Sequence, residues 1–249
     1  MPLAATGPDG HLAKGLFMPP LPFPRRLWAG SRMTFASPIR IGERVRKVNT
    51  ISDIRVKEGR SGPMGFVTMT QDVFGADDRL TTREERTQVY CEVADPDAPK
   101  PKPRPVPADP AWSRTVHPTP VLLFRYSALT MNCHRIHYDL DYARDVEGCP
   151  GLLVHGPLTM TLKLDLFRRE MPDAWIESFD LRVVAPVYDT MDFSVHGAPG
   201  DEPGRCRLWA MSDLLRDPAG RPIPAGLRLL AKPANERPER SGGERPGRR

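Results

Sequence analysis

Apolar and polar residues alternate along several segments in the first half of the chain. Residues 44–56 show the clearest alternation, which predicts a half-buried strand with one slip, typical of a bulge, at 48–51. Residues 28–35 and 65–74 also read as strands. Residues 79–93 are ambiguous, because their charge suits a helix and their Thr, Val and Tyr content suits a strand. We predict a strand, which continues an antiparallel meander.

The second half follows a different pattern. Residues 120–129 form an apolar run that we expect to be a strand. Residues 155–171 predict the longest helix, because Leu158, Leu162 and Leu166 recur at helical spacing. Further strands are expected at 175–187, 191–198, 205–215 and 226–232.

A helix that is apolar over much of its surface needs a sheet wrapped around it. The sequence therefore predicts an α+β hotdog fold in the second half. The first half supplies strands but no matching helix.

Proline usage divides the chain. Of 29 prolines, seven fall within residues 94–110, which predicts a stiff, extended linker. The expected units are an N-terminal half at 1–93, a linker at 94–118, a catalytic half at 119–232 and a disordered basic tail at 233–249. With 249 residues and 39% hydrophobic content, both halves can bury a core.

Charge and cysteine usage narrow the setting. The net charge is +5, and the tail from Lys232 onward holds six Lys/Arg against three Glu, which favours a solvated terminus over a nucleic-acid contact. The four cysteines lack pairing motifs, so we expect reduced thiols and a cytoplasmic protein. The sequence has no apolar run long enough to span a membrane and no secretory signal pattern.

Polar residues concentrate in the stretch YSALTMNCHRIHYDLDYA, residues 126–143. A metal site is disfavoured, because His134 and His137 lack a further ligand block at zinc-like spacing. A structural role is the second alternative, with Asn132 capping a short helix or shaping a turn and the histidines as satisfied surface groups. Acid/base catalysis is the third, since an imidazole can move protons near neutral pH and an amide can hold a water. The N–H of Gly156, at the start of the long helix, could then stabilise an enolate oxygen.

This stretch, followed by PGLLVHGPL, resembles the hydratase motif of MaoC-like acyl-CoA dehydratases. In that alignment Asn132 falls at the catalytic aspartate and His137 at the catalytic histidine. The form NCHRIHYD, with MPPLPFPRRLWAGSRMTF and EGRSGPMGFVTM upstream, is similar to the branch that contains 3-methylfumaryl-CoA (mesaconyl-C4-CoA) hydratases and mitochondrial type 2 hydroxyacyl-thioester dehydratases. The resemblance covers residues 8–215.

The resemblance implies a double hotdog in which the first half shapes the acyl pocket. Relatives carry a further segment with the first hotdog's helix, so we expect a shortened or misassigned start. The implied catalytic residues are Asn132, His137 and Gly156, and the implied substrate-binding residues are Tyr126, Arg135 and His155. Arg135 either binds a substrate carboxylate or faces the solvent or the CoA phosphates. His155 either lies beside the thioester or serves as a capping or packing group.

The implied activity is that of a hydro-lyase converting mesaconyl-C4-CoA to citramalyl-CoA. Two alternatives stay open: a fatty-acid-type 3-hydroxyacyl-thioester dehydratase, and a degenerate acyl-CoA-binding subunit. A buried arginine near the site would favour a dicarboxylyl substrate, and a wholly apolar pocket a fatty acyl chain. No metal or cofactor is expected besides the CoA of the substrate. The expected assembly is a homodimer.

Overall fold

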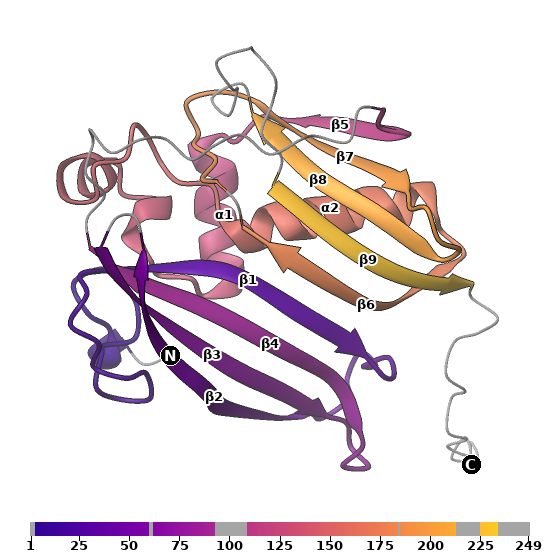
Figure 1. The fold of residues 1–249 in the computed structure, drawn as a ribbon, viewed down its shortest axis with the longest axis horizontal. Coiled ribbons are helices and arrows are strands. Elements are labelled where there is room, and N and C mark those ends of the chain that lie inside the picture. Colours follow the sequence, from indigo (N-terminus) through magenta and orange to yellow (C-terminus); the bar gives the residue numbers. More distant parts are fainter. Residues whose placement is uncertain (1–2, 60–61, 93–108, 184, 213–224, 234–249) are drawn as a thin grey trace, which may run out of the picture.

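The sheet runs through both halves of the molecule. The computed structural model describes residues 3–59, 62–92, 109–183, 185–212 and 225–233, the last of these by backbone only. Nine antiparallel strands lie in the order β2-β3-β4-β1-β6-β9-β8-β7-β5 (Figure 1). They are β1 (Arg25–Phe35), β2 (Arg46–Gly59), β3 (Gly62–Phe74), β4 (Leu80–Cys91), β5 (Trp112–Val116), β6 (Ala174–Arg182), β7 (Phe193–Pro199), β8 (Arg205–Ser212) and β9 (Ala225–Pro233).

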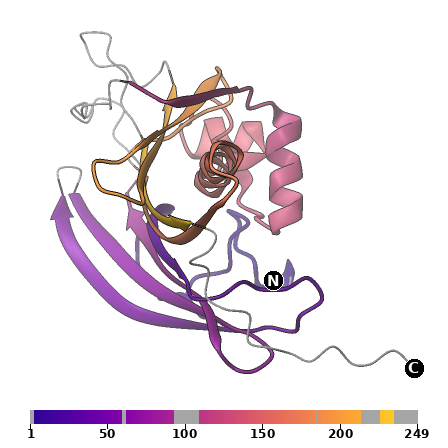
Figure 2. The ribbon, with the colours of Figure 1, turned by 90° about the vertical axis from the view of Figure 1, so that its right-hand side faces the viewer.

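The helices belong to the second half. They are α1 (Pro120–Thr130), the 3-10 helix η2 (Arg135–His137), the π-helix η3 (Tyr142–Val146) and α2 (Gly156–Glu170). The strands of this half curve around α2, which contacts β5, β7 and β8 (Figure 2). Leu158, Leu166 and Phe167 lie on the buried side of α2. The predicted hotdog is therefore confirmed, because the apolar helix is enclosed by the sheet.

The first half has strands but no α-helix within residues 3–59 and 62–92, where the 3-10 turn η1 (Leu3–Ala5) is the one helical element. The N-terminal segment covers part of its inner face instead. Met18 and Phe23 pack against Val67 of β3 and Tyr90 of β4. Within the described residues, the two half-sheets and one long helix match the predicted double hotdog whose first half supplies no matching helix.

The two halves join through β1 and β6. Gly30 of β1 pairs with both Thr87 of β4 and Arg182 of β6. A Cβ at Gly30 would lie 2.3 Å from the carbonyl oxygen of Leu181, so a side chain cannot fit there. This glycine allows the first half-sheet to pack closely against the second.

One predicted strand is wrong: residues 120–129 form helix α1. Thr119 caps the helix by accepting a hydrogen bond from the N–H of Leu122, and Pro120 occupies the first turn. These start signals favour a helix. The apolar run does not contradict it, because such a run fits a half-buried helix as well as a strand. The helix ends at Met131, whose φ is 51°.

The linker boundary at residue 118 is also wrong, because Trp112–Val116 forms the edge strand β5. Residues 94–108 of the predicted linker and residues 234–249 of the predicted tail lie outside the described residues. The other predicted strands and the long helix are confirmed, although β6 ends at Arg182 and not at 187, and residues 213–215 lie outside the described residues. The slip predicted at 48–51 corresponds to a register shift in β2 between Ile51 and Asp53. Among the described helices, none combines the length and apolar character needed to cross a membrane.

Candidate active site

The polar cluster forms the turn between α1 and η2. The Asn132 N–H donates to the carbonyl of Ser127 at 2.9 Å, and the Asn132 side-chain oxygen accepts the N–H of His134 at 3.2 Å. Asn132 therefore shapes the turn, as the structural alternative predicted, but His134 and His137 are buried and are not the surface groups that it expected. Within the described part of the chain, no group accepts a hydrogen bond from its amide nitrogen, which leaves that nitrogen able to donate to a water.

His137 is buried and fixed in one tautomer. Its Nδ1 lies 2.7 Å from the carbonyl oxygen of Leu153, which can only accept, so Nδ1 carries the hydrogen. The other ring nitrogen, Nε2, then has a free lone pair. Burial lowers the pKa of His137 to about 4, against the opposing effect of the Leu153 hydrogen bond. The ring is thus neutral at pH 7, in the form that a general base requires.

His155 stacks on His137. The ring centroids are 3.8 Å apart and the planes are inclined by 18°. His155 is fully buried, and its Nε2 lies 2.8 Å from the hydroxyl of Ser127. Its Nδ1 has no hydrogen-bond partner among the described residues. His155 occupies the N-cap position of α2, but its side chain makes no capping hydrogen bond and packs against neighbouring rings instead.

Gly156 is the first residue of α2, where backbone N–H groups carry partial positive charge. A Cβ at this position would lie 2.5 Å from Cε3 of Trp28 on β1. The indole from the first half thus approaches the helix start directly. His137 donates a hydrogen bond to the carbonyl of Leu153, which precedes Gly156 by three residues. This bond holds the base against the same segment that carries the Gly156 N–H.

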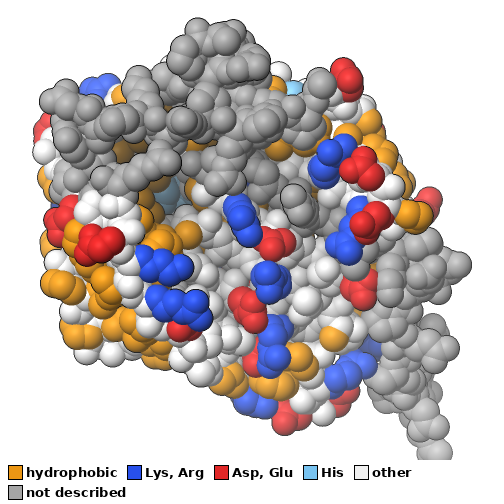
Figure 3. Space-filling model, viewed as in Figure 1, with side chains coloured by type: hydrophobic (Ala, Val, Ile, Leu, Met, Phe, Trp, Pro, Cys, Tyr) orange, Lys and Arg blue, Asp and Glu red, His pale blue; other side chains and the backbone are white. Residues whose placement is uncertain are grey.

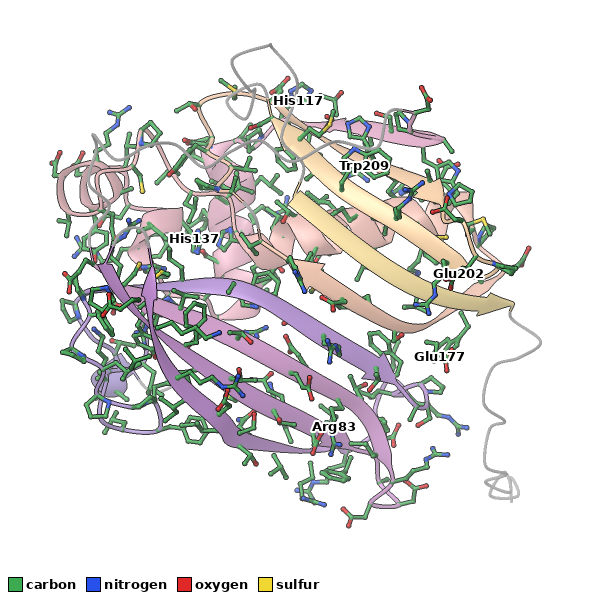
Figure 4. All side chains as sticks on the ribbon, in the orientation of Figure 1. Arg83, His117, His137, Glu177, Glu202 and Trp209 are labelled. Carbon is green, nitrogen blue, oxygen red and sulfur yellow. The ribbon has the colours of Figure 1, made fainter. Side chains whose placement is uncertain are left out.

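Tyr126 of α1 lies on the other side of His155. Its ring centroid is 4.9 Å from that of His155, in an edge-on arrangement, and its hydroxyl is 3.4 Å from the hydroxyl of Thr161. Burial raises the pKa of Tyr126. The structure therefore gathers Tyr126, His137, His155 and the start of α2 in one place, where Figure 4 shows His137 beside the helices, close to the junction of the halves.

Comparison with known proteins identifies the family. Residues 2–189 match the hydroxyacyl-thioester dehydratases type 2. The chain belongs to this family. It is 44% identical over 201 residues to the mesaconyl-C(4)-CoA hydratase of Chloroflexus aurantiacus, covering 81% of this chain and 71% of that protein. It is 27% identical over 206 residues to the mitochondrial hydroxyacyl-thioester dehydratase type 2 of Schizosaccharomyces pombe, covering 72% and 67%.

A solved structure supports the fold. The MaoC-like dehydratase from Phytophthora capsici superimposes with a TM-score of 0.64 at 13% identity, covering 91% of this chain and 80% of that one. The predicted MaoC-like, hotdog character of this hydroxyacyl-thioester dehydratase family member is confirmed. The family consists of hydro-lyases, so the expectation of an enzyme of the hydratase and dehydratase class is confirmed as well.

The guanidinium of Arg135, a predicted ligand of the substrate carboxylate, is engaged by other groups of the protein. Its guanidinium binds Asp139 at 2.8 and 2.9 Å, donates to the carbonyl of Pro8 at 3.3 Å and lies 4.2 Å from the ring centroid of Tyr142. The backbone N–H of Arg135 also donates to the carbonyl of Asp9. These contacts hold the N-terminal segment against the motif. They do not support binding of a substrate carboxylate by Arg135.

Sequence reasoning missed one member of the histidine cluster, His11. The His11 ring lies 4.2 Å from that of His134, which lies 5.5 Å from that of His137. His134 is buried, and burial lowers the pKa values of both His11 and His134. Behind them Arg26 is buried and pairs with Asp9. His134 was visible in the motif, but no sequence signal pointed to His11, because it comes from a distant loop.

The chemistry of these rings suits proton transfer. In the described residues, no three His, Cys, Asp or Glu side chains are arranged to hold a metal ion. The Nδ1 of His137 is engaged by a carbonyl and the Nε2 of His155 by a hydroxyl. What the cluster offers is one oriented neutral base beside a helix N-terminus.

Proposed function

We propose that this chain adds water to an α,β-unsaturated acyl-CoA thioester, and that its substrate is mesaconyl-C4-CoA, which becomes citramalyl-CoA. The hydrogen bond from His137 Nδ1 to Leu153 carries the proposal, because it fixes the tautomer whose Nε2 has a free lone pair to take a proton. The 44% identity to a protein named as mesaconyl-C(4)-CoA hydratase supports this substrate over a fatty acyl thioester.

In the first step, Nε2 of His137 takes a proton from a water that the Asn132 amide helps to hold. The water oxygen forms a bond to the β-carbon of the substrate. The electron pair of the double bond moves toward the thioester carbonyl and gives an enolate. The imidazolium that forms would be costly in a buried site, but the enolate is an opposite charge nearby and raises the proton affinity of His137 as the reaction proceeds.

In the second step, the Gly156 N–H stabilises the enolate oxygen at the positive end of α2. His137 then returns its proton to the α-carbon, so the proton taken from water ends on the product. Tyr126 and His155 form the wall of the site, where His155 supports the His137 ring by stacking on it. These residue roles are inferred from the positions of the side chains, and substitution of each residue tests them.

The reaction moves only a water molecule, so we propose that it needs no metal or redox cofactor. Activity should survive treatment with a chelator followed by desalting, and loss of activity restored by a metal would contradict this.

We also propose a cytoplasmic homodimer. The outer side of α1 exposes Val121, Phe124 and Leu129, an apolar surface that a second copy could cover. Light scattering of the purified protein would give its mass, and a monomer at micromolar concentration would contradict the assembly.

The decisive experiment follows the loss of enoyl-thioester absorbance with mesaconyl-C4-CoA and with crotonyl-CoA. His137→Asn keeps an N–H that can reach Leu153 but removes the base, so turnover should fall by about 10²- to 10⁴-fold. The matched control is His196→Asn, another buried histidine, whose ring bonds Ser194 and stacks on Trp209. Unchanged turnover in His137→Asn would contradict the mechanism, and preference for crotonyl-CoA would contradict the substrate.

A further inference from the structure

The first half presents polar side chains to the side of the sheet that packs toward α2. Glu84, Arg86 and Gln88 alternate along β4 and so project to the same face. Their partners on β1 are, in order, Met33, Ser31 and Trp28. Met33 and Trp28 pack with the apolar cluster around Phe167 of α2, which identifies this face as the inner one. An inner face with a charged pair is unlike the apolar lining that a fatty acyl chain requires.

Arg86 is held by one nitrogen only. Its Nε donates to Oε1 of Glu84 at 3.0 Å, and the Ser31 hydroxyl donates to the same oxygen. The Glu84 side chain is only 7% exposed, so the carboxylate is buried and fixed between the two strands. In the described parts of the chain, the two terminal nitrogens of Arg86 have no hydrogen-bond partner. The Arg86 side chain is 30% exposed, so part of it is open to a ligand.

Contacts place Arg86 next to the candidate active site. Its guanidinium lies 5.6 Å from the ring centroid of Trp28, which abuts Gly156. Burial raises the pKa of Tyr126, and the charge of Arg86 acts against that rise, so the two groups are within electrostatic reach. Tyr126 in turn contacts His155, which stacks on His137. A cation from the first half therefore stands beside the proposed oxyanion donor and the wall of the site.

We propose that Arg86 is the specificity-determining residue, and that its terminal nitrogens bind the free carboxylate of a dicarboxylyl-CoA substrate. Glu84 positions it by fixing Nε, and Trp28 supports the guanidinium face. This inference rests on the proposed function. A guanidinium matches a carboxylate with two parallel hydrogen bonds, which gives direction as well as attraction. In mesaconyl-C4-CoA the carboxylate is attached to the β-carbon, so binding it would also fix the carbon that receives water.

Binding of saturated thioesters tests this proposal without turnover. Succinyl-CoA carries a carboxylate on its β-carbon, and butyryl-CoA carries a methyl group there. Isothermal titration of the wild type and of Arg86→Gln gives the ratio of the two dissociation constants. The preference for succinyl-CoA over butyryl-CoA should fall by roughly 10- to 100-fold in Arg86→Gln, the range for loss of a hydrogen-bonded charge. Arg86→Lys should keep part of it, because it retains the charge but not the paired geometry.

The control is Arg83→Gln. Arg83 lies on the same strand but on the opposite face, where it pairs with Asp72 (Figure 4). That outer face carries interleaved basic and acidic side chains (Figure 3). Arg83→Gln removes the same charge and should leave the ratio unchanged.

Turnover gives a second reading. Arg86→Gln should lower kcat/KM for mesaconyl-C4-CoA by a similar factor and leave crotonyl-CoA within about threefold, since only the first has the carboxylate. An equal loss for both thioesters, or an unchanged succinyl to butyryl ratio, would overturn the proposal. If the wild type hydrates neither substrate, the proposed function fails, yet the binding ratio still decides the role of Arg86.

Discussion

The imidazole rings of His137 and His155 stack with centroids 3.8 Å apart. Two stacked imidazolium ions would repel each other, and the positive charge of either ring disfavours protonation of its neighbour. Burial, together with the neighbouring His137 and His134, lowers the pKa of His155 to about 3. His155 therefore stays neutral, and His137 is the ring whose tautomer the Leu153 carbonyl fixes with Nε2 free to accept a proton.

The pH dependence of the free enzyme follows from this pair. His137 must be neutral to act as a base, and its pKa is lowered to about 4 from an ordinary 6.5. Activity should therefore hold as pH falls from 8 to about 5 and should decline as pH falls through about 4. The measurement is kcat/KM across pH 3.5–8, with enzyme held at each pH and assayed again at pH 7 to exclude irreversible loss.

Crotonyl-CoA is the control substrate for that profile, because it has no carboxyl group of its own to titrate. An acid limb centred near 6.5 would show that His137 is exposed to water in the working enzyme. Such a result would contradict the buried, neutral base.

Asn132 has a structural and a chemical role that two substitutions separate. Asn132→Asp keeps an acceptor for the His134 N–H, so the free energy of unfolding should stay near that of the wild type. Asn132→Ala removes the acceptor and should cost about 1 kcal/mol. Both variants lose the N–H that holds the water, so kcat/KM should fall by about tenfold in each. Urea unfolding and the hydration assay give the two quantities.

Wild-type turnover in Asn132→Asp would show that the amide N–H is not needed, and would limit Asn132 to shaping the turn. An Asn132→Ala variant as stable as the wild type would contradict the structural role instead.

Gly10 packs the N-terminal segment against the motif. Its φ is +84°, and a Cβ there would lie 1.8 Å from the carbonyl oxygen of Cys133. Gly10→Ala should therefore lower the free energy of unfolding by about 2–4 kcal/mol, through backbone strain and overpacking together, and should reduce turnover by moving the turn. Gly42 is the matched control, because its φ is +86° with no described atom within 4 Å.

Gly42→Ala meets the backbone strain alone and should cost about 1 kcal/mol without loss of turnover. Equal effects of the two substitutions in urea unfolding would show that the contact between Gly10 and Cys133 is unimportant.

Local patterns predicted much of the fold. The alternation along residues 44–56 and 65–74 became β2 and β3, and the leucine spacing of 155–171 became α2, because each pattern reports which side of an element is buried. The prediction for the apolar run at 120–129 was wrong, because a run without alternation does not report which side is buried and fits a helix or a strand. The cap at Thr119 favours the helix.

The candidate site divides in the same way. The sequence by itself determined the motif that holds Asn132 and His137, the helix start at Gly156 and the nearness of His155 to it, because these residues are close along the chain. Only the tertiary structure decided that His11 joins the histidines, that Arg135 binds the carbonyl of Pro8, and that Arg86 is the cation beside the site. Those contacts depend on the pairing of β1 with β6 and on the path of the N-terminal segment, which bring together residues far apart in sequence and leave no local pattern to read.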